Sequence, residues 1–157
     1  ASKVPKLDEG EVVVELGAGT GAITRQLLKS GLEGHQLVSV ERSNAMSEHL
    51  RKTFPEVTVL EGDACELRVL LKQHLGLGVD AVASIVSGLP LRSLPGPVVD
   101  AIVSEVYQTL SPGGRFIQFT YYIRPRANPV LSAFRRKETR IIWANFPPAR
   151  VDVYQRV

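Results

Sequence analysis

The residues best suited to chemistry lie in a glycine-rich segment that directly follows a short apolar run. Valines occupy positions 12–14, Glu15 follows, and glycines stand at positions 17, 19 and 21. Glycine adopts positive φ angles and has no Cβ, so it permits a tight turn from strand to helix and lets a ligand lie against bare backbone. The segment therefore predicts a cofactor loop made of Gly17, Ala18, Gly19, Thr20 and Gly21.

The charge of Glu15 favours one kind of cofactor. A dinucleotide would place its pyrophosphate at the start of the following helix, where anions are stabilised, and a carboxylate two residues ahead of Gly17 would repel it. S-adenosylmethionine has no phosphate and carries an ammonium and a sulfonium group. Glu15 therefore indicates S-adenosylmethionine as the cofactor.

Two further carboxylates follow apolar runs, Glu41 after residues 37–40 and Asp63 after residues 57–60. Glu41 can accept charge-assisted hydrogen bonds from both ribose hydroxyls of an adenosine, which suits several adenosine cofactors equally. Asp63 can accept the adenine amine, or it can cap the helical segment that follows it. Both readings of Asp63 remain open on the sequence.

The elements that must position these residues alternate between strands and helices. Strands are expected at 12–16, 37–40, 57–60, 81–86 and 116–122, and helices at 22–28, 45–53, 67–75 and 98–110. Beyond them we expect a helix at 130–137 and a closing antiparallel hairpin with strands at 140–144 and 151–155. This order predicts an α/β fold with a doubly wound, mostly parallel sheet, in which ligands bind beyond the carboxyl ends of the strands.

The composition of the chain limits the classes of protein to which it can belong. The chain has 157 residues, 44% of them apolar, and is expected to form one domain over residues 1–157, without room for the second domain of a dehydrogenase. It has no apolar run of membrane-spanning length and no visible signal peptide, so a cytoplasmic protein is expected. Cys65 is the only cysteine, and the three histidines lack metal-ligand spacing, so no metal site is expected. Because few residues precede the first strand, we expect an upstream segment to be missing, and the family resemblance given below implies that this N-terminal segment is helical.

Charge is unevenly distributed along the chain. Residues 115–157 hold nine Lys and Arg against two Asp and Glu, although the whole chain has a net charge of only +3. Such a segment suits phosphate on lipid or nucleic acid, or forms a solvated strand edge and helix face. The arginines available to hold a phosphate are Arg124, Arg126, Arg135, Arg136 and Arg140.

With these residues in place, the chain resembles the class I methyltransferases that use S-adenosylmethionine, over roughly residues 11–120. The resemblance implies a seven-stranded Rossmann-like sheet. It places the methionine and ribose along the three glycines, the ribose hydroxyls at Glu41 and the adenine at Asp63 and Ala64. The full cofactor-binding set that it implies is Glu15, Gly17, Ala18, Gly19, Thr20, Gly21, Glu41, Arg42, Asp63, Ala64 and Ser87.

The segment Ser87-Gly88-Leu89-Pro90-Leu91 occupies the place of the family's substrate motif. In the adenine N6-methyltransferases, including the ribosomal RNA dimethylases, that motif is an Asn or Asp, one residue, a Pro and an aromatic residue. This chain keeps the proline and lacks both the amide and the aromatic ring. Because a flipped base is held by stacking and edge hydrogen bonds, nucleic acid is disfavoured as the substrate.

A closer resemblance, over nearly the whole chain, is to the bacterial phospholipid N-methyltransferases. It rests on three separated segments, residues 87–91, 118–121 and 145–149. It implies methylation of phosphatidylethanolamine at the anionic inner face of the membrane, with peripheral attachment. The residues expected at the reacting amine are Ser87, Gly88, Leu89, Pro90 and Tyr121.

The implied reaction is in-line displacement at the sulfonium methyl group by a neutral amine, accelerated mainly by positioning. Tyr121 and Tyr122 point to opposite faces of their strand, so only one of them can face the site. Two alternatives stay open on the sequence: an RNA or DNA adenine N6-methyltransferase, and a non-catalytic scaffold that binds S-adenosylmethionine.

Overall fold

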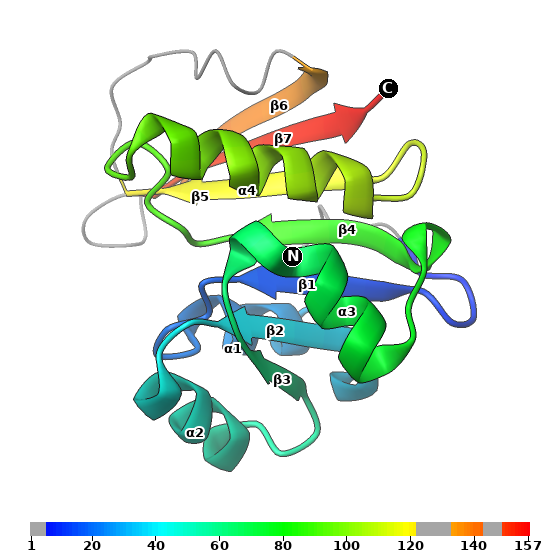
Figure 1. Cartoon of the computed structure of the whole chain (residues 1–157), viewed down its shortest axis with the longest axis vertical. Coiled ribbons are helices and arrows are strands. Elements are labelled where there is room, and N and C mark those ends of the chain that lie inside the picture. Colours follow the sequence, from blue (N-terminus) through cyan, green and yellow to red (C-terminus); the bar gives the residue numbers. More distant parts are fainter. Residues whose placement is uncertain (1–5, 122–132, 143–148) are drawn as a thin grey trace.

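The computed structural model describes residues 6–121, 133–142 and 149–157, which form one sheet with helices on both faces (Figure 1). The strands are β1 Val12–Leu16, β2 Leu37–Glu41, β3 Thr58–Glu61, β4 Val82–Ser87, β5 Arg115–Thr120, β6 Phe134–Ile142 and β7 Ala149–Arg156. The α-helices are α1 Ala22–Lys29, α2 Asn44–Thr53, α3 Leu67–Leu75 and α4 Gly96–Thr109. Short 3₁₀ turns occupy Gly34–Gln36, Ala64–Glu66 and Val79–Ala81.

The sheet has seven strands among the described residues, in the order β3-β2-β1-β4-β5-β7-β6. Strands β1 to β5 are parallel, and β7 is antiparallel to both of its neighbours. The strand order reverses between β1 and β4, which is where a doubly wound sheet binds its ligand. The predicted fold class, including the antiparallel C-terminal strands, is confirmed.

One predicted element is wrong. The sequence predicts a helix at 130–137, but β6 begins at Phe134 and pairs along its length with β7. The charged residues that follow Phe134 are compatible with a helix face, and tertiary packing overrides that local preference. The Phe134 ring packs edge-to-face on Tyr107 at 5.3 Å and lies 5.8 Å from Phe116, which fixes the strand at its start.

The core has two layers, one on each face of the sheet. On one face, α3 and α4 bury apolar side chains such as Leu71 and Ile102 against Ile85. On the other face, Leu27 of α1 and Leu50 of α2 pack in the second layer, and Figure 1 shows α1 behind the sheet and α3 in front. Every residue of β4 is buried because helices cover both of its faces.

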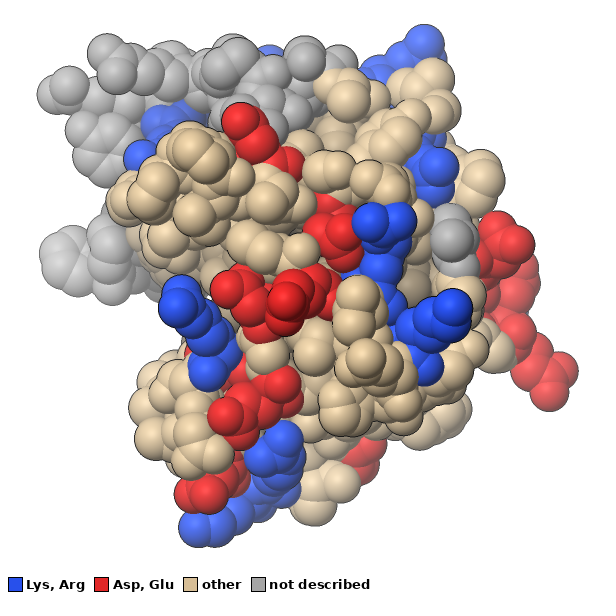
Figure 2. Space-filling model, in the orientation of Figure 1, with Lys and Arg blue, Asp and Glu red and all other residues tan. Residues whose placement is uncertain are grey.

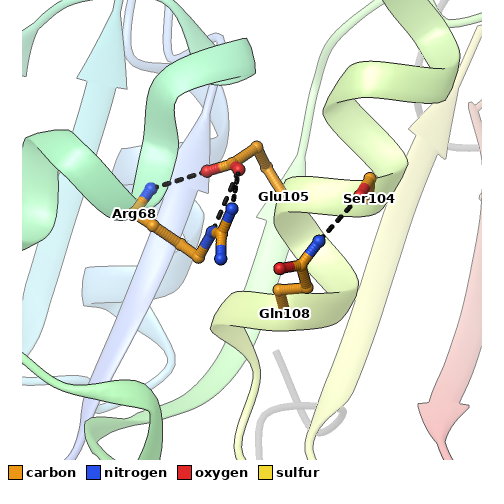
Figure 3. A network of polar contacts seen from close by, with 4 residues as sticks. All are labelled: Arg68, Ser104, Glu105 and Gln108. Atoms are coloured by element: carbon orange, nitrogen blue, oxygen red, sulfur yellow. Dashed lines mark hydrogen bonds and ion pairs between the residues drawn. The ribbon is translucent and has the colours of Figure 1, made fainter.

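Helices α3 and α4 are joined by a polar contact at the surface of their layer (Figure 3). The Glu105 carboxylate accepts hydrogen bonds from the Arg68 backbone N–H at 2.8 Å and from Arg68 Nε at 3.0 Å. Figure 2 shows acidic side chains gathered over this part of the face, with basic ones around them. On the same helix, Gln108 donates to Ser104 Oγ at 2.9 Å, which is a bond within α4.

We expect Glu105→Ala to lower the free energy of unfolding by about 1–2 kcal/mol, because it removes charge-assisted bonds between two helices. Gln108→Ala is the matched control on the same helix, and its effect should stay within about 0.5 kcal/mol. Urea denaturation followed by circular dichroism measures both. Equal effects of the two substitutions would contradict a role of Glu105 in joining the helices.

Candidate functional site

The glycine loop lies at the carboxyl end of β1, and all three of its glycines have positive φ angles. A Cβ at Gly17 would lie 2.5 Å from Leu89 Cδ2, and one at Gly21 would lie 2.4 Å from Phe54 Cε2. A Cβ at Gly19 would have nothing within 4 Å. The outer glycines therefore allow close packing, whereas the middle glycine presents bare backbone to open space, as a bound ligand requires.

Glu41 holds this loop from the neighbouring strand. Its Oε2 accepts a hydrogen bond from the Gly19 N–H at 2.8 Å, and its Oε1 accepts one from the Ser43 N–H at 2.9 Å. Each carboxylate oxygen has capacity for a second donor. The structure thus brings Glu41 and Gly19 together, with acceptor capacity left for the ribose hydroxyls.

Glu15 lies beneath the loop, in the interior of the protein. Its side chain is fully buried, and Oε2 accepts hydrogen bonds from Thr24 Oγ1 at 2.7 Å and Ser39 Oγ at 2.8 Å. Burial raises the pKa of this carboxyl, and the bonds from Thr24 and Ser39 oppose the shift. Oε1 has no partner among the described residues. A carboxylate oxygen so placed suits the cationic, phosphate-free cofactor, whose contact with Glu15 stays a prediction.

Sequence reasoning missed Thr24 and Ser39. Both are small polar residues in otherwise apolar elements, and each is fully buried. A hydroxyl on the buried side of a helix or strand needs an acceptor. That requirement is the only signal that could have linked them to Glu15.

Asp63 caps the turn that follows β3. Its Oδ1 accepts a hydrogen bond from the Cys65 N–H at 2.8 Å, so the capping role that the sequence left open is confirmed. Burial, together with Asp63, raises the pKa of the Cys65 thiol, which argues against a nucleophilic role for Cys65. Ala64 is buried beside Asp63, and Arg42 is exposed after β2. Adenine binding by Asp63 stays a prediction.

The loop after β4 is anchored to both neighbouring strands. The Gly88 N–H donates to the Leu16 carbonyl of β1 at 3.0 Å, and Gln118 Nε2 of β5 donates to the Leu89 carbonyl at 2.8 Å. The Leu89 carbonyl also accepts the Leu91 N–H at 2.9 Å, so both of its lone pairs are used. Inside the loop, the buried Ser87 Oγ accepts the Leu89 N–H at 3.2 Å.

The side chain of Leu91 turns away from this loop. Leu91 is 5% exposed and belongs to the core layer of α3 and α4. Leu89 is only partly buried and packs against the same layer. Of the two leucines, Leu89 is thus the one that borders the glycine loop.

The remaining predicted residues are spread more widely. Tyr121 is 52% exposed just beyond the carboxyl end of β5. Arg135, Arg136 and Arg140 are exposed on β6. The predictions for Tyr122, Arg124, Arg126 and segment 145–148 fall outside the described residues.

Two kinds of feature are absent from the described residues. No group of three or more His, Cys, Asp or Glu side chains that could hold a metal ion occurs among them. No helix in the described ranges has the length and apolar character needed to span a membrane.

With the geometry established, the chain was compared with known proteins. A family described as "Methyltransferase domain" matches residues 13–114. An ornithine lipid N-methyltransferase of Singulisphaera acidiphila is 34% identical over 116 residues, which are 72% of this chain and 59% of the relative. A ribosomal RNA small subunit methyltransferase A of Phenylobacterium zucineum is 28% identical over 188 residues, covering 99% of this chain and 64% of the relative. The chain thus spans less than two thirds of the length of these relatives.

Solved structures share the fold at low sequence identity. The 1,6-didemethyltoxoflavin-N1-methyltransferase of Burkholderia thailandensis, solved with S-adenosylhomocysteine, gives a TM-score of 0.70 at 15% identity. The alignment covers 93% of this chain and 71% of that one. A TehB-like methyltransferase of Corynebacterium glutamicum gives 0.68 at 16% identity, with coverage of 96% and 83%.

We expect Gly19→Ala to weaken binding of S-adenosylmethionine by about tenfold or more, because the added methyl group enters the space beside the loop. Gly76→Ala is the matched control, since Gly76 has a similar φ of +62° against +55° and its Cβ would also meet nothing within 4 Å. Both variants carry similar backbone strain. Calorimetric titration should find weakened binding only for Gly19→Ala, and equal affinities would remove Gly19 from the cofactor site.

We also expect a pH-dependent contribution of Glu15 to stability. Because its pKa is raised in the folded state, the folded protein binds the proton more tightly than the unfolded chain does. The stability of the wild type relative to Glu15→Gln should therefore fall as the pH rises above the ordinary value of 4.5, until the folded-state pKa is passed. Urea denaturation of both proteins from pH 4 to 8 measures the difference, and a pH-independent difference would contradict the expectation.

Proposed function

This chain belongs to the class I methyltransferases that use S-adenosylmethionine, and we propose that it methylates the amine of a membrane-lipid head group. Phosphatidylethanolamine is the acceptor implied by the sequence resemblance. Ornithine lipid is the acceptor in the name of the Singulisphaera relative. Both are zwitterions that present an amine to the enzyme.

The observation that carries the proposal is the environment of the loop after β4. Leu91 stands where base-methylating relatives have their aromatic residue, and it is buried in the core. Gly88 supplies no amide side chain. A flipped base would therefore lack a stacking surface and an edge contact in this loop, whereas an aliphatic amine needs neither.

In this proposal, residues at the ends of the first three strands would position the cofactor. The backbone at Gly19 would line the methionine and ribose, Glu41 the ribose hydroxyls, and Asp63 the adenine. When bound, S-adenosylmethionine would supply an electrophilic methyl group for transfer to the acceptor nitrogen.

The acceptor amine must lose its proton before it reacts. An ammonium with a pKa near that of lysine costs about 4–5 kcal/mol to deprotonate at pH 7. The apolar surface of Leu89 and Pro90 would lower that pKa by desolvation. Since the Leu89 carbonyl already accepts two hydrogen bonds, the Gly88 carbonyl is our candidate for orienting the amine, with Tyr121 at the rim.

Peripheral attachment to the anionic inner face of the membrane is part of the proposal. It is supported by the excess of positive charge in residues 115–157 and by the exposed Lys137 and Arg140 on β6. Attraction of this kind weakens as ionic strength rises.

Methylation of ribosomal RNA adenine is the second candidate function, because several relatives of similar identity carry that name. This function would require the loop after β4 to bind a base although Leu91, at the position of the aromatic residue, is buried. A scaffold that binds S-adenosylmethionine without transferring its methyl group is the third.

We expect labelled methyl groups to pass from S-adenosylmethionine to vesicles that contain phosphatidylethanolamine or ornithine lipid, and not to ribosomal RNA. Vesicles of phosphatidylcholine, which has no free amine, are the control for non-specific labelling. Thin-layer chromatography of the lipids identifies the product. Labelling of RNA alone would replace the lipid assignment, and cofactor binding without any labelled acceptor would favour the scaffold.

A further inference from the structure

A buried side-chain oxygen near the carboxyl end of β5 has no hydrogen-bond partner. Gln118 is 6% exposed, and its Oε1 is one of the buried side-chain atoms that lack a partner within the described residues. Gln118 is the last buried residue of β5, since Phe119 and Thr120 are partly exposed and Tyr121 is exposed. Because a buried acceptor without a donor is unfavourable, this oxygen indicates a position where a donor on a ligand can bind.

The orientation of the Gln118 amide is fixed by the protein. Its Nε2 donates to the Leu89 carbonyl at 2.8 Å and to the Phe119 carbonyl at 2.8 Å. Both amide hydrogens are therefore used, and turning the amide over would place Oε1 against two other acceptors. The two bonds thus leave Oε1 as the atom that remains for a ligand.

This oxygen lies beside the loop proposed to hold the reacting amine. Gln118 is opposite Ser87 in the register of β5 and β4. Because Oε1 and Nε2 share one carbon atom, Oε1 is held next to the Leu89 carbonyl that Nε2 contacts. Leu89 in turn packs against Gly17 of the glycine loop. A series of direct contacts therefore joins Oε1 to the proposed position of the methyl donor.

Neighbouring acceptors already have donors. The Leu89 carbonyl accepts two hydrogen bonds and has no further lone pair. The carboxylate of Asp152, which is opposite Gln118 on β7, pairs with Arg150 at 2.8 Å and accepts Thr139 Oγ1 at 2.6 Å. Of the side chains that the structure describes here, Gln118 therefore offers the acceptor without a protein donor.

A neutral acceptor of this kind suits an amine that is about to be methylated. As the amine reacts, positive charge develops on its nitrogen and its N–H bonds become stronger donors. A hydrogen bond to an amide oxygen therefore strengthens in the transition state. A carboxylate in the same place would raise the pKa of the amine and favour its unreactive protonated form. The amide avoids that effect.

We propose that Gln118 Oε1 accepts a hydrogen bond from an N–H of the acceptor amine and makes the site specific for amines that still carry a hydrogen. This inference rests on the proposed function and deepens it, because it assigns a residue that distinguishes the substrate from a fully methylated product. A quaternary ammonium has no N–H and leaves Oε1 without a partner. The fully methylated product is therefore bound more weakly than the substrate.

Soluble head groups test this contact without methyl transfer. Phosphoethanolamine and phosphocholine share the same phosphate, and methyl groups replace all three N–H hydrogens in phosphocholine. In titration calorimetry with saturating S-adenosylhomocysteine, the wild type should bind phosphoethanolamine more tightly. Gln118→Met has a similar length and no amide oxygen. It should weaken binding of phosphoethanolamine about tenfold more than binding of phosphocholine, the expected loss of one hydrogen bond to a charged group.

Gln155→Met is the matched control, because Gln155 also donates from a strand to a loop carbonyl, that of Gly113 at 3.1 Å. Gln155 is opposite Arg115 at the amino end of β5, away from the proposed site. This variant should keep the wild-type preference for phosphoethanolamine. Gln118→Asn keeps an amide but is one methylene shorter, so it should reduce the preference as well, and it replaces Gln118→Met if that variant does not fold.

Equal weakening of both head groups by Gln118→Met overturns the inference, since loss of a merely structural contact would affect them alike. Equal binding of both by the wild type also overturns it. Failure of the proposed function has a different signature, because lipid vesicles then remain unmethylated while a preference that depends on Gln118 persists. With lipid acceptors, Gln118→Met should slow transfer to phosphatidylethanolamine more than transfer to its dimethyl derivative, whose neutral amine has no N–H.

Discussion

The site depends on a carboxylate that is fully enclosed by protein. Glu15 is the residue before the last one of β1, and its Oε2 accepts hydrogen bonds from Thr24 of α1 and Ser39 of β2. Burying this group is unfavourable unless donors compensate, so β1, α1 and β2, which surround the glycine loop, must meet at one point. Glu41 then fixes the loop from outside through the Gly19 N–H. The conformation of the glycine loop thus follows from two acids, one below it and one beside it.

The glycine loop also fixes the position of the loop after β4, which is proposed to bind the acceptor amine. Leu89 packs so closely against Gly17 that a Cβ at Gly17 would lie 2.5 Å from its side chain. The Gly88 N–H donates to Leu16 in β1, next to Gly17 in the chain. The segments proposed to hold the methyl donor and the amine are therefore parts of one packed unit. In a displacement accelerated mainly by positioning, such direct packing limits misalignment of the reactants.

The strand ends could be predicted from the sequence because apolar runs and glycines mark them directly. Glu15, Glu41 and Asp63 all lie at the carboxyl ends of the first three strands or just beyond them, as expected. Contacts between side chains of different helices and strands could not be predicted from the sequence. The sequence around Gln118 contains no signal for its hydrogen bond to the Leu89 carbonyl. The charged residues after Phe134 likewise contain no signal for strand β6, because the packing of Phe134 on Tyr107 determines the structure of that segment. The capping role of Asp63 stood among the alternatives, since it needs only its own neighbours.

The order of the strands converts the uneven charge of the sequence into a charge difference across the site. Strands β1, β2 and β3 lie on one side of β4, and β5, β7 and β6 lie on the other. The acids Glu15 and Glu41 consequently belong to the half that would hold a cation, and Arg136 and Arg150 to the opposite half. Positive residues dominate from 115 to 157, so the second half attracts anions. The lipid acceptors proposed above are zwitterions, and their anionic group would meet more positive charge on the side of β4 that holds β5, β7 and β6 than on the other side.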